Sequence, residues 1–322
     1  MNLHTNTEQF LTLVNFTAEH FQILPMFIEK DYWITRSLQR MSQNNNAEKV
    51  VFKGGTALSK AFRLTNRFSE DIDIAVIDAN SFTGNQLKTL IKRLAKDMAS
   101  DLEEKVVKGV TSKGSRFYRS IYLYPNYNNT DTSTVKAGQL LIEINTYGNP
   151  YPYVKQEISS FISDYLTAIN RQDLLKQYNV EPFAINVLDK RRTILEKLVS
   201  LLRFSFSEDT LTALAGKIRH FYDLHYLSND KECSDYIQSS AFYRDLQELF
   251  INDQTEFDIP QGWTDKLISA SPLLYDFPTI WQGIRSTYQT ELRPLAFIEI
   301  PDEKEIESTF NILIDRMKKG SR

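Results

Sequence analysis

Hydrophobic positions follow two spacings in the first half of the chain and mostly one in the second half. Apolar residues recur every three or four positions in segments that we expect to be helices, and every second position in segments that we expect to be strands. Helices of the first half are predicted in residues 8–24, 27–41 and 85–107, with another after a Gly-Gly pair at 54–55. Strands are predicted at both ends of 51–77, in the segment that runs through Tyr124, and in 138–150.

Two prolines, Pro150 and Pro152, mark a change to a mostly helical pattern. The expected elements after them are helices in residues 160–170, 172–177, 189–204 and 211–227, a short extended piece at 186–188 and an amphipathic terminal helix. A chain of 322 residues can hold about two domains. We therefore predict an α/β (α+β) N-terminal domain with a mixed sheet in residues 1–155 and a mostly helical domain in residues 156–322.

The stretch 51–77 combines a glycine turn with a pair of carboxylates. Gly54 and Gly55 end an apolar run and open a helix with Thr56. Glycine allows positive φ and close approach, and the N–H groups of a helix N-terminus suit an anion such as a phosphate. Asp71 and Asp73 follow on a strand, where residues two apart share a face. Two adjacent carboxylates repel unless a cation lies between them, and their oxygens suit Mg²⁺. The alternative is a surface turn followed by two solvated aspartates.

A third acidic residue, Glu143, stands in the middle of the last strand predicted for this domain. Leucine and isoleucine occupy both faces of that strand, which is typical of a strand inside a sheet. A carboxylate at such a position is costly without a partner. Glu143 is therefore expected to have a partner, such as a lysine or arginine in a structural ion pair.

The composition is that of a globular protein, with 42% hydrophobic and 25% charged residues. No apolar run is long enough to span a bilayer, the N-terminus lacks the regions of a signal peptide, and the single cysteine, Cys233, excludes an internal disulfide. We therefore expect a cytoplasmic protein without a membrane partner. The net charge of −3 gives no overall attraction to nucleic acid, so RNA binding would need a local basic surface.

The window G-G-T-A-L-S-K followed by R-F-S-E-D-I-D-I resembles the signature of the AbiEii/AbiGii toxin family of nucleotidyltransferases, which includes the MenT-type toxins. The match is specific because a glycine turn, a helix and a D-x-D pair coincide in one short window. The resemblance covers roughly residues 25–230. It implies a nucleotidyltransferase-like N-terminal domain that binds an NTP together with Mg²⁺ or Mn²⁺. Because nucleotidyltransferases usually take a third carboxylate from a strand beside the D-x-D pair, it also implies that Glu143 is a third metal ligand beside Asp71 and Asp73.

The resemblance also implies roles for individual residues. Gly54, Gly55, Thr56 and Lys60 of the window would bind the triphosphate. Family members carry a lysine on one helix and an R-x-x-x-D-L pattern on the next, and Lys197 and Asp223 match these positions. Lys197 would bind the triphosphate and Asp223 would complete the active site, both contributed to the cleft by the helical domain. The alternatives are a solvated lysine and a surface ion pair between Arg219 and Asp223.

Implied partners are a cognate antitoxin and, as in MenT-type relatives, the 3′ end of tRNA. The basic and aromatic stretch 108–124 agrees with RNA, because arginine and lysine can track a phosphate backbone while aromatic rings stack on bases. A sheet strand with a basic rim would have the same pattern. The segment 29–33 resembles one that family members carry before the glycines, where Lys30 or Asp31 would brace the strand pair rather than form a solvated helix turn.

Ser69 carries a separate hypothesis. It lies two residues before Asp71, and some MenT-type relatives are silenced by phosphorylation at the matching serine. A phosphate there would add about two negative charges beside the carboxylates and compete with the incoming triphosphate. A plain turn or capping serine is the alternative.

The main hypothesis is a toxin that transfers an NMP from an NTP to its acceptor and so blocks translation. Two other functions remain open. The chain could bind nucleotide, RNA or a partner protein without catalysis, or it could transfer a nucleotide to a protein or a small molecule. The chain has no P-loop, dinucleotide-binding, nucleophile-elbow or zinc-protease motif that would favour another chemistry.

Overall fold

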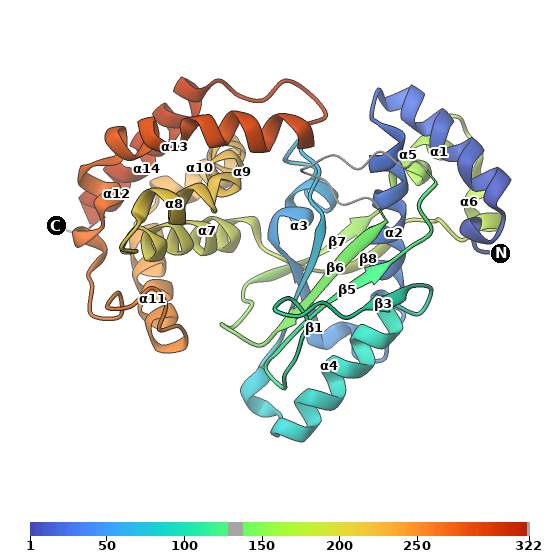
Figure 1. The fold of residues 1–322 in the computed structure, drawn as a ribbon, viewed down its shortest axis with the longest axis horizontal. Coiled ribbons are helices and arrows are strands. Elements are labelled where there is room, and N and C mark those ends of the chain that lie inside the picture. The colour runs from blue at the N-terminus through green and yellow to red at the C-terminus, as the bar shows by residue number, and fades with distance from the viewer. Residues whose placement is uncertain (128–137, 321–322) are drawn as a thin grey trace. The chain divides into compact units, whose positions relative to one another are not determined.

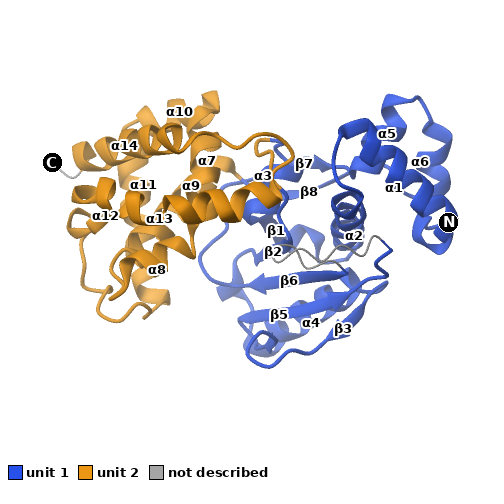
Figure 2. Cartoon of the chain, turned by 45° about the horizontal axis from the view of Figure 1, so that its top comes forward, with its two compact units in different colours: residues 1–63, 68–188 blue, residues 64–67, 189–322 orange. Residues whose placement is uncertain are grey.

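The computed structural model describes residues 1–127 and 138–320, and the chain divides into two compact units (Figure 2). The first unit contains Met1–Arg63 and Phe68–Leu188, and the second contains Leu64–Arg67 and the chain from Asp189 onward. The sheet-bearing unit therefore continues past residue 155, where the proline signals placed the boundary. Among the described residues, no helix has the length and apolar character needed to cross a membrane.

The first unit is built on a mixed sheet, as predicted (Figure 1). In the described part of the chain its strands follow the order β3-β5-β6-β2-β1-β8-β7, and β4 pairs with β5 outside this order. Strand β1 is parallel to β8 and β2 is parallel to β6, whereas the other pairs are antiparallel. The bounds are β1 (Val50–Lys53), β2 (Asp71–Val76), β3 (Glu103–Lys105), β4 (Ser112–Lys113), β5 (Phe117–Leu123), β6 (Gln139–Asn145), β7 (Tyr153–Ile158) and β8 (Phe183–Leu188).

One face of this sheet is buried under helices. Its central positions, Ile72 and Ile74 of β2 and Ile142 and Ile144 of β6, are all 0% exposed. Helices α2 and α4 contact each other and β6. The helices of the unit are α1 (Thr7–Phe21), α2 (Pro25–Ser42), α3 (Gly54–Lys60), α4 (Gly84–Met98), α5 (Phe161–Ala168) and α6 (Gln172–Tyr178), with short 3₁₀ turns at Leu3–Thr5, Ala47–Lys49 and Ala79–Ser81. The opposite face of β2 and β6 carries the acidic residues.

Two expectations for this unit were wrong. The helix expected in 85–107 ends at Met98, because the apolar stripe stops there and the polar segment Glu103–Lys105 pairs with β5 as an edge strand. Strands also do not stop at the prolines, because Tyr153–Ile158 and Phe183–Leu188 pair with each other and join β1. Pairing within the sheet outweighs the weak local signal of these two segments.

The second unit is helical. Its helices are α7 (Lys190–Phe204), α8 (Thr210–Ala215), α9 (Ile218–Asn229), α10 (Lys231–Gln238), α11 (Ala241–Glu256), α12 (Pro272–Tyr275), α13 (Phe277–Leu292) and α14 (Glu303–Gly320), with 3₁₀ turns at Ile268–Ala270 and Arg293–Leu295. Asp189 caps the N-terminus of α7, since its carboxylate accepts from the Arg191 backbone N–H at 2.8 Å. The helix expected in 211–227 is divided into α8 and α9. Aromatic rings of α9, α13 and α14 form the centre of the core.

Candidate active site

The turn from β1 into α3 is shaped by a close approach between Gly54 and Asp73. Gly54 has φ +82°, and a Cβ placed on it would collide with the Asp73 carboxylate. Asp73 lies directly opposite Lys53 in the antiparallel β1–β2 pair, so the strand register brings its side chain over the start of α3. A glycine is needed at position 54 both for the left-handed backbone and for the space that Asp73 occupies.

Thr56 fastens the first turn of α3 to the start of β2. Its side chain is buried, and its hydroxyl donates to the Asp71 carbonyl oxygen at 2.5 Å. The Ser69 Oγ lies 2.9 Å from the same Thr56 oxygen. Because a hydroxyl carries one hydrogen, Ser69 is then the donor in that contact. The Thr56 hydroxyl therefore holds the backbone of Asp71 next to the first turn of α3. A role of Thr56 in triphosphate binding stays a prediction.

Three carboxylates lie along one face of the sheet. Asp71 and Asp73 alternate with buried isoleucines on β2, and Glu143 of β6 lies directly opposite Asp73 in the parallel pair. Burial raises the pKa of Glu143, and the negative charge of Asp71 raises it further, whereas Arg119 opposes the shift. The Arg119 Nε lies 3.7 Å from Glu143 Oε2. Asp71, Asp73 and Glu143 form a carboxylate row, in which burial and mutual repulsion both disfavour the ionised form of Glu143.

This donor set fits a hard divalent cation in part. Within the described residues, no group of three histidine, cysteine, aspartate or glutamate side chains is placed to hold a metal ion. Mg²⁺ is commonly held by one or two carboxylates together with substrate phosphates and water. Asp71 and Asp73 satisfy that requirement by face and register, and the role of Glu143 as a third ligand stays a prediction.

Charged residues of α2 support the same region from within the unit. Lys30 is 2% exposed and donates to Glu70 at 2.7 Å, directly before Asp71 in the chain. Asp31 accepts from Lys60 Nζ at 2.5 Å and from the Phe161 backbone N–H at 2.9 Å. The alternative of a solvated first turn is wrong, because both α2 residues are buried.

Lys60 therefore has a structural partner. Its side chain is 8% exposed and its ammonium group forms an ion pair with Asp31. Burial raises the pKa of Asp31, although Lys60 acts in the opposite direction. That Lys60 binds the nucleotide stays a prediction, in which its ammonium group would contact both the Asp31 carboxylate and the ligand.

In the helical unit, Lys197 and Asp223 are brought together. Asp223 is fully buried and accepts from Lys197 Nζ at 2.7 Å. Arg67 adds a bidentate contact, with its Nε and Nη2 each 2.8 Å from one Asp223 oxygen. Burial alone would raise the pKa of Asp223, but the two cations hold it well below its ordinary value. The alternative of a solvated lysine is therefore wrong, because Lys197 is buried.

Arg67 is the residue that sequence reasoning missed. It is the first residue of the R-F-S-E-D-I-D-I motif, and its signal was hidden among the surrounding polar residues. The Arg219–Asp223 pair considered from the helical spacing is wrong, because Arg219 lies 3.9 Å from Glu291 instead. Burial lowers the pKa of His220 well below its ordinary value, and the positive charge of Lys197 lowers it further, whereas Asp223 opposes the shift.

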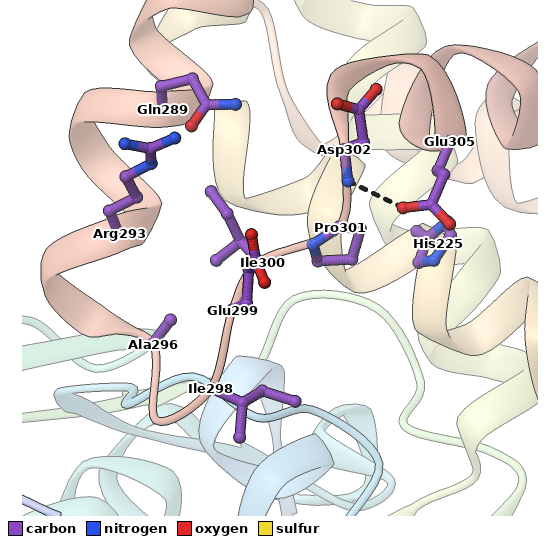
Figure 3. A pocket seen from close by; sticks show the side chains of 10 residues that line it. All are labelled: His225, Gln289, Arg293, Ala296, Ile298, Glu299, Ile300, Pro301, Asp302 and Glu305. Carbon is purple, nitrogen blue, oxygen red and sulfur yellow. Dashed lines mark hydrogen bonds between the residues drawn. The ribbon is translucent and has the colours of Figure 1, made fainter.

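The helical unit also has a hollow of about 640 Å³ (Figure 3). Gln289 of α13 and Arg293, directly after the end of that helix, border one side of it, and His225 and Glu305 border another. The Asp302 backbone N–H donates to Glu305 at 2.8 Å at its rim. None of the site residues predicted from the sequence lines this hollow.

Comparison with known proteins gives a family match. The family model described as "Nucleotidyl transferase AbiEii toxin, Type IV TA system" matches residues 36–310. Among solved structures, a candidate nucleotidyltransferase from H. pylori is 16% identical, with a TM-score of 0.43 and coverage of 88% of this chain and 93% of that one. MenT4, a nucleotidyltransferase toxin from Mycobacterium tuberculosis, is 16% identical, with a TM-score of 0.42 and coverage of 93% and 98%. No curated protein matches the sequence.

Proposed function

The chain belongs to the AbiEii family of nucleotidyltransferase toxins of type IV toxin–antitoxin systems, and we propose that it transfers a nucleoside monophosphate from an NTP to the 3′ end of tRNA. The carboxylate row of Asp71, Asp73 and Glu143 beside the Gly54 turn is the observation that carries this proposal. The implied consequence is a block of translation, relieved when a cognate antitoxin is present.

The proposed reaction is a single in-line displacement. The acceptor hydroxyl oxygen forms a bond to the α-phosphorus of the NTP, the bond from that phosphorus to the bridging oxygen of the β-phosphate breaks, and pyrophosphate leaves. The hydroxyl proton passes to solvent. A divalent cation, Mg²⁺ or Mn²⁺, would supply Lewis-acid stabilisation of the phosphate oxygens when bound.

The chain's own residues position these groups. Asp71 and Asp73, with Glu143, would hold the cation, and their spacing is fixed by the β2–β6 register. The N–H groups of the Gly54-Gly55-Thr56 turn would approach the β- and γ-phosphates. A turn that is pre-formed in this way loses little entropy when the substrate binds.

Lys197 and Asp223 remain proposed site residues. The Lys197 ammonium would contact the triphosphate as a point charge, and Asp223 would hold it in one orientation. The contacts from Asp223 to both Lys197 and Arg67 support a positioning role for this carboxylate.

The test is transfer of label from each α-³²P-labelled NTP to total tRNA in the presence of Mg²⁺. We expect label on tRNA with wild type and none with Asp71→Asn or after chelation with EDTA. The matched control is Asp173→Asn, because Asp173 is a solvent-exposed aspartate of the same unit.

Other outcomes separate the alternatives. Label on a protein or a small molecule would retain the chemistry and replace the acceptor. Nucleotide binding without any transfer would favour a non-catalytic binding module and would contradict the proposal.

A further inference from the structure

Two aromatic side chains meet at one end of the carboxylate face. Phe117 begins β5, and Tyr147 lies two residues beyond the end of β6. Their rings are stacked, with centroids 6.1 Å apart and planes inclined by 28°. The Arg116 guanidinium lies 5.6 Å from the centre of the Tyr147 ring. We call Phe117 and Tyr147 the stacking pair.

The strand register places the stacking pair close to the acidic row. Phe117 lies opposite Asn145 of β6, and two residues further along β5 Arg119 lies opposite Glu143. Residues two apart on a strand are separated by about 6.7 Å and neighbouring strands by about 4.8 Å. The Phe117 backbone is therefore about 8 Å from that of Glu143, on the same face of the sheet. A single nucleoside can bridge this span.

The remaining aromatic residues of this strand have a different role. Tyr118 and Tyr122 point to the opposite face, and both are 5% exposed. Their hydroxyl groups lie 2.6 Å apart and form a hydrogen bond inside the unit. Phe117 and Tyr147 are only partly buried. The aromatic residues of β5 therefore lie on two faces of the sheet. Tyr118 and Tyr122 are buried on one face, and Phe117 lies on the carboxylate face, where a ligand can reach its ring.

Partly exposed aromatic rings beside guanidinium groups are suited to an unpaired nucleobase. Every base has a π-face that stacks on an aromatic ring, and arginine adds cation–π attraction and positive charge for the adjoining phosphate. Arg116 and Arg119 both lie at this end of β5, and Arg119 is 40% exposed. An aliphatic ligand would gain burial here but would gain nothing from the paired rings.

We propose that the stacking pair of Phe117 and Tyr147 binds one unpaired nucleobase next to the carboxylate row, with Arg116 contributing charge to its phosphate. This inference rests on the proposed function, because it assigns a position to a base of one of the two substrates. The base belongs either to the incoming NTP or to the end of the acceptor strand.

Equilibrium binding to the full-length protein tests the proposal without turnover. One arm measures binding of a 5′-fluorescein RNA hexamer without NTP, and compares it with the same hexamer whose last residue lacks its base. The other arm measures binding of each NTP without RNA, and compares it with ribose 5-triphosphate. Loss of one stacked base corresponds to a change in affinity of about 5- to 150-fold.

The variants are Phe117→Leu and Tyr147→Leu, with Phe117→Tyr as the conservative exchange. We expect both leucine variants to lower the affinity for a base-bearing probe by about 5- to 150-fold. The affinity for the corresponding base-free probe should not change. Phe117→Tyr should bind as wild type. Phe16→Leu is the control, because Phe16 is a 51% exposed aromatic of α1 in the same unit.

The arm in which the loss occurs identifies the source of the base. An equal loss of affinity for base-bearing and base-free probes, or no loss of affinity for either, would overturn the proposal. Melting curves check that the variants are folded, and Tyr147→Leu lies outside any strand, so it keeps the test valid if Phe117→Leu unfolds. A loss of affinity that is selective for base-bearing probes, in a protein that transfers no nucleotide to tRNA, would support the stacking pair and contradict the proposed function.

Discussion

Replacing Gly54 by alanine separates the stability of the turn from its role at the carboxylates. An L-residue in the left-handed region costs about 1–2 kcal/mol, and Gly54 has φ +82°. The added Cβ would also meet the Asp73 carboxylate, which is the end of a flexible side chain and can rotate away. We therefore expect a loss of stability that reflects the backbone alone, and a displaced Asp73. Misplacement of a reacting group by about 1 Å can cost about 100-fold in rate.

The matched control is Gly109→Ala. Gly109 has the same φ of +82°, but, apart from its chain neighbours, no atom of the described residues lies within 4 Å of the position that its Cβ would take. Both variants should lower the Tm by about 2–8 °C in a domain of this size. Only Gly54→Ala should lose transfer activity, by about 100-fold or more in kcat. Wild-type activity of Gly54→Ala, or an equal loss in Gly109→Ala, would refute the inference that Gly54 makes room for Asp73.

Asp223→Asn removes the charge that holds Arg67 and Lys197, so the free energy of unfolding in urea should fall by about 3–5 kcal/mol, whereas the exposed Asp173→Asn should change it little. Because folding lowers the pKa of Asp223, its contribution is complete above the unfolded-state pKa of about 3.9 and is lost as the pH falls below that value. The gap between wild type and Asp223→Asn should therefore narrow below about pH 4, and a constant gap would contradict the ion cluster. Lys60→Met leaves the Asp31 carboxylate buried without its cation and should lower the Tm by several degrees, whereas the exposed Lys176→Met should not; an unchanged Tm would show that the pair contributes nothing. Ser69→Asp places a negative charge beside the carboxylates and should abolish transfer, with Ser69→Ala active; full activity and toxicity of Ser69→Asp would end the phosphorylation hypothesis.

The sequence was most informative where local pattern and chemistry agree. The alternation of isoleucine and aspartate in β2 predicted both its buried and its acidic face, because a strand admits only those two directions. Glu143 was located by the cost of placing a carboxylate inside an apolar strand. The structure puts it opposite Asp73 and gives it an ion-pair partner, because Arg119 Nε lies 3.7 Å from Glu143 Oε2. Its role as a metal ligand stays a prediction.

Long-range partners could not be read from the sequence. Helical spacing offered Arg219 as the partner of Asp223, whereas the structure supplies Arg67 from a segment 156 residues earlier. Lys60 appeared to be a ligand-binding lysine, and its pairing with Asp31 depends on the packing of α3 near α2. Strand β7 was missed, and β8 was predicted only as a short extended piece at 186–188, because pairing in the sheet, rather than local propensity, stabilises them.

The measurement that tests the central claim most directly follows both ends of the NTP in one reaction with tRNA and Mg²⁺. One sample carries ³²P at the α-phosphate and a parallel sample carries it at the γ-phosphate, each with wild type and with Asp73→Asn. Nucleotidyl transfer predicts α-label on tRNA and γ-label in pyrophosphate, in equal amounts, with both absent in the variant. Appearance of the γ-label on the acceptor, or pyrophosphate release that persists in Asp73→Asn, would contradict the account.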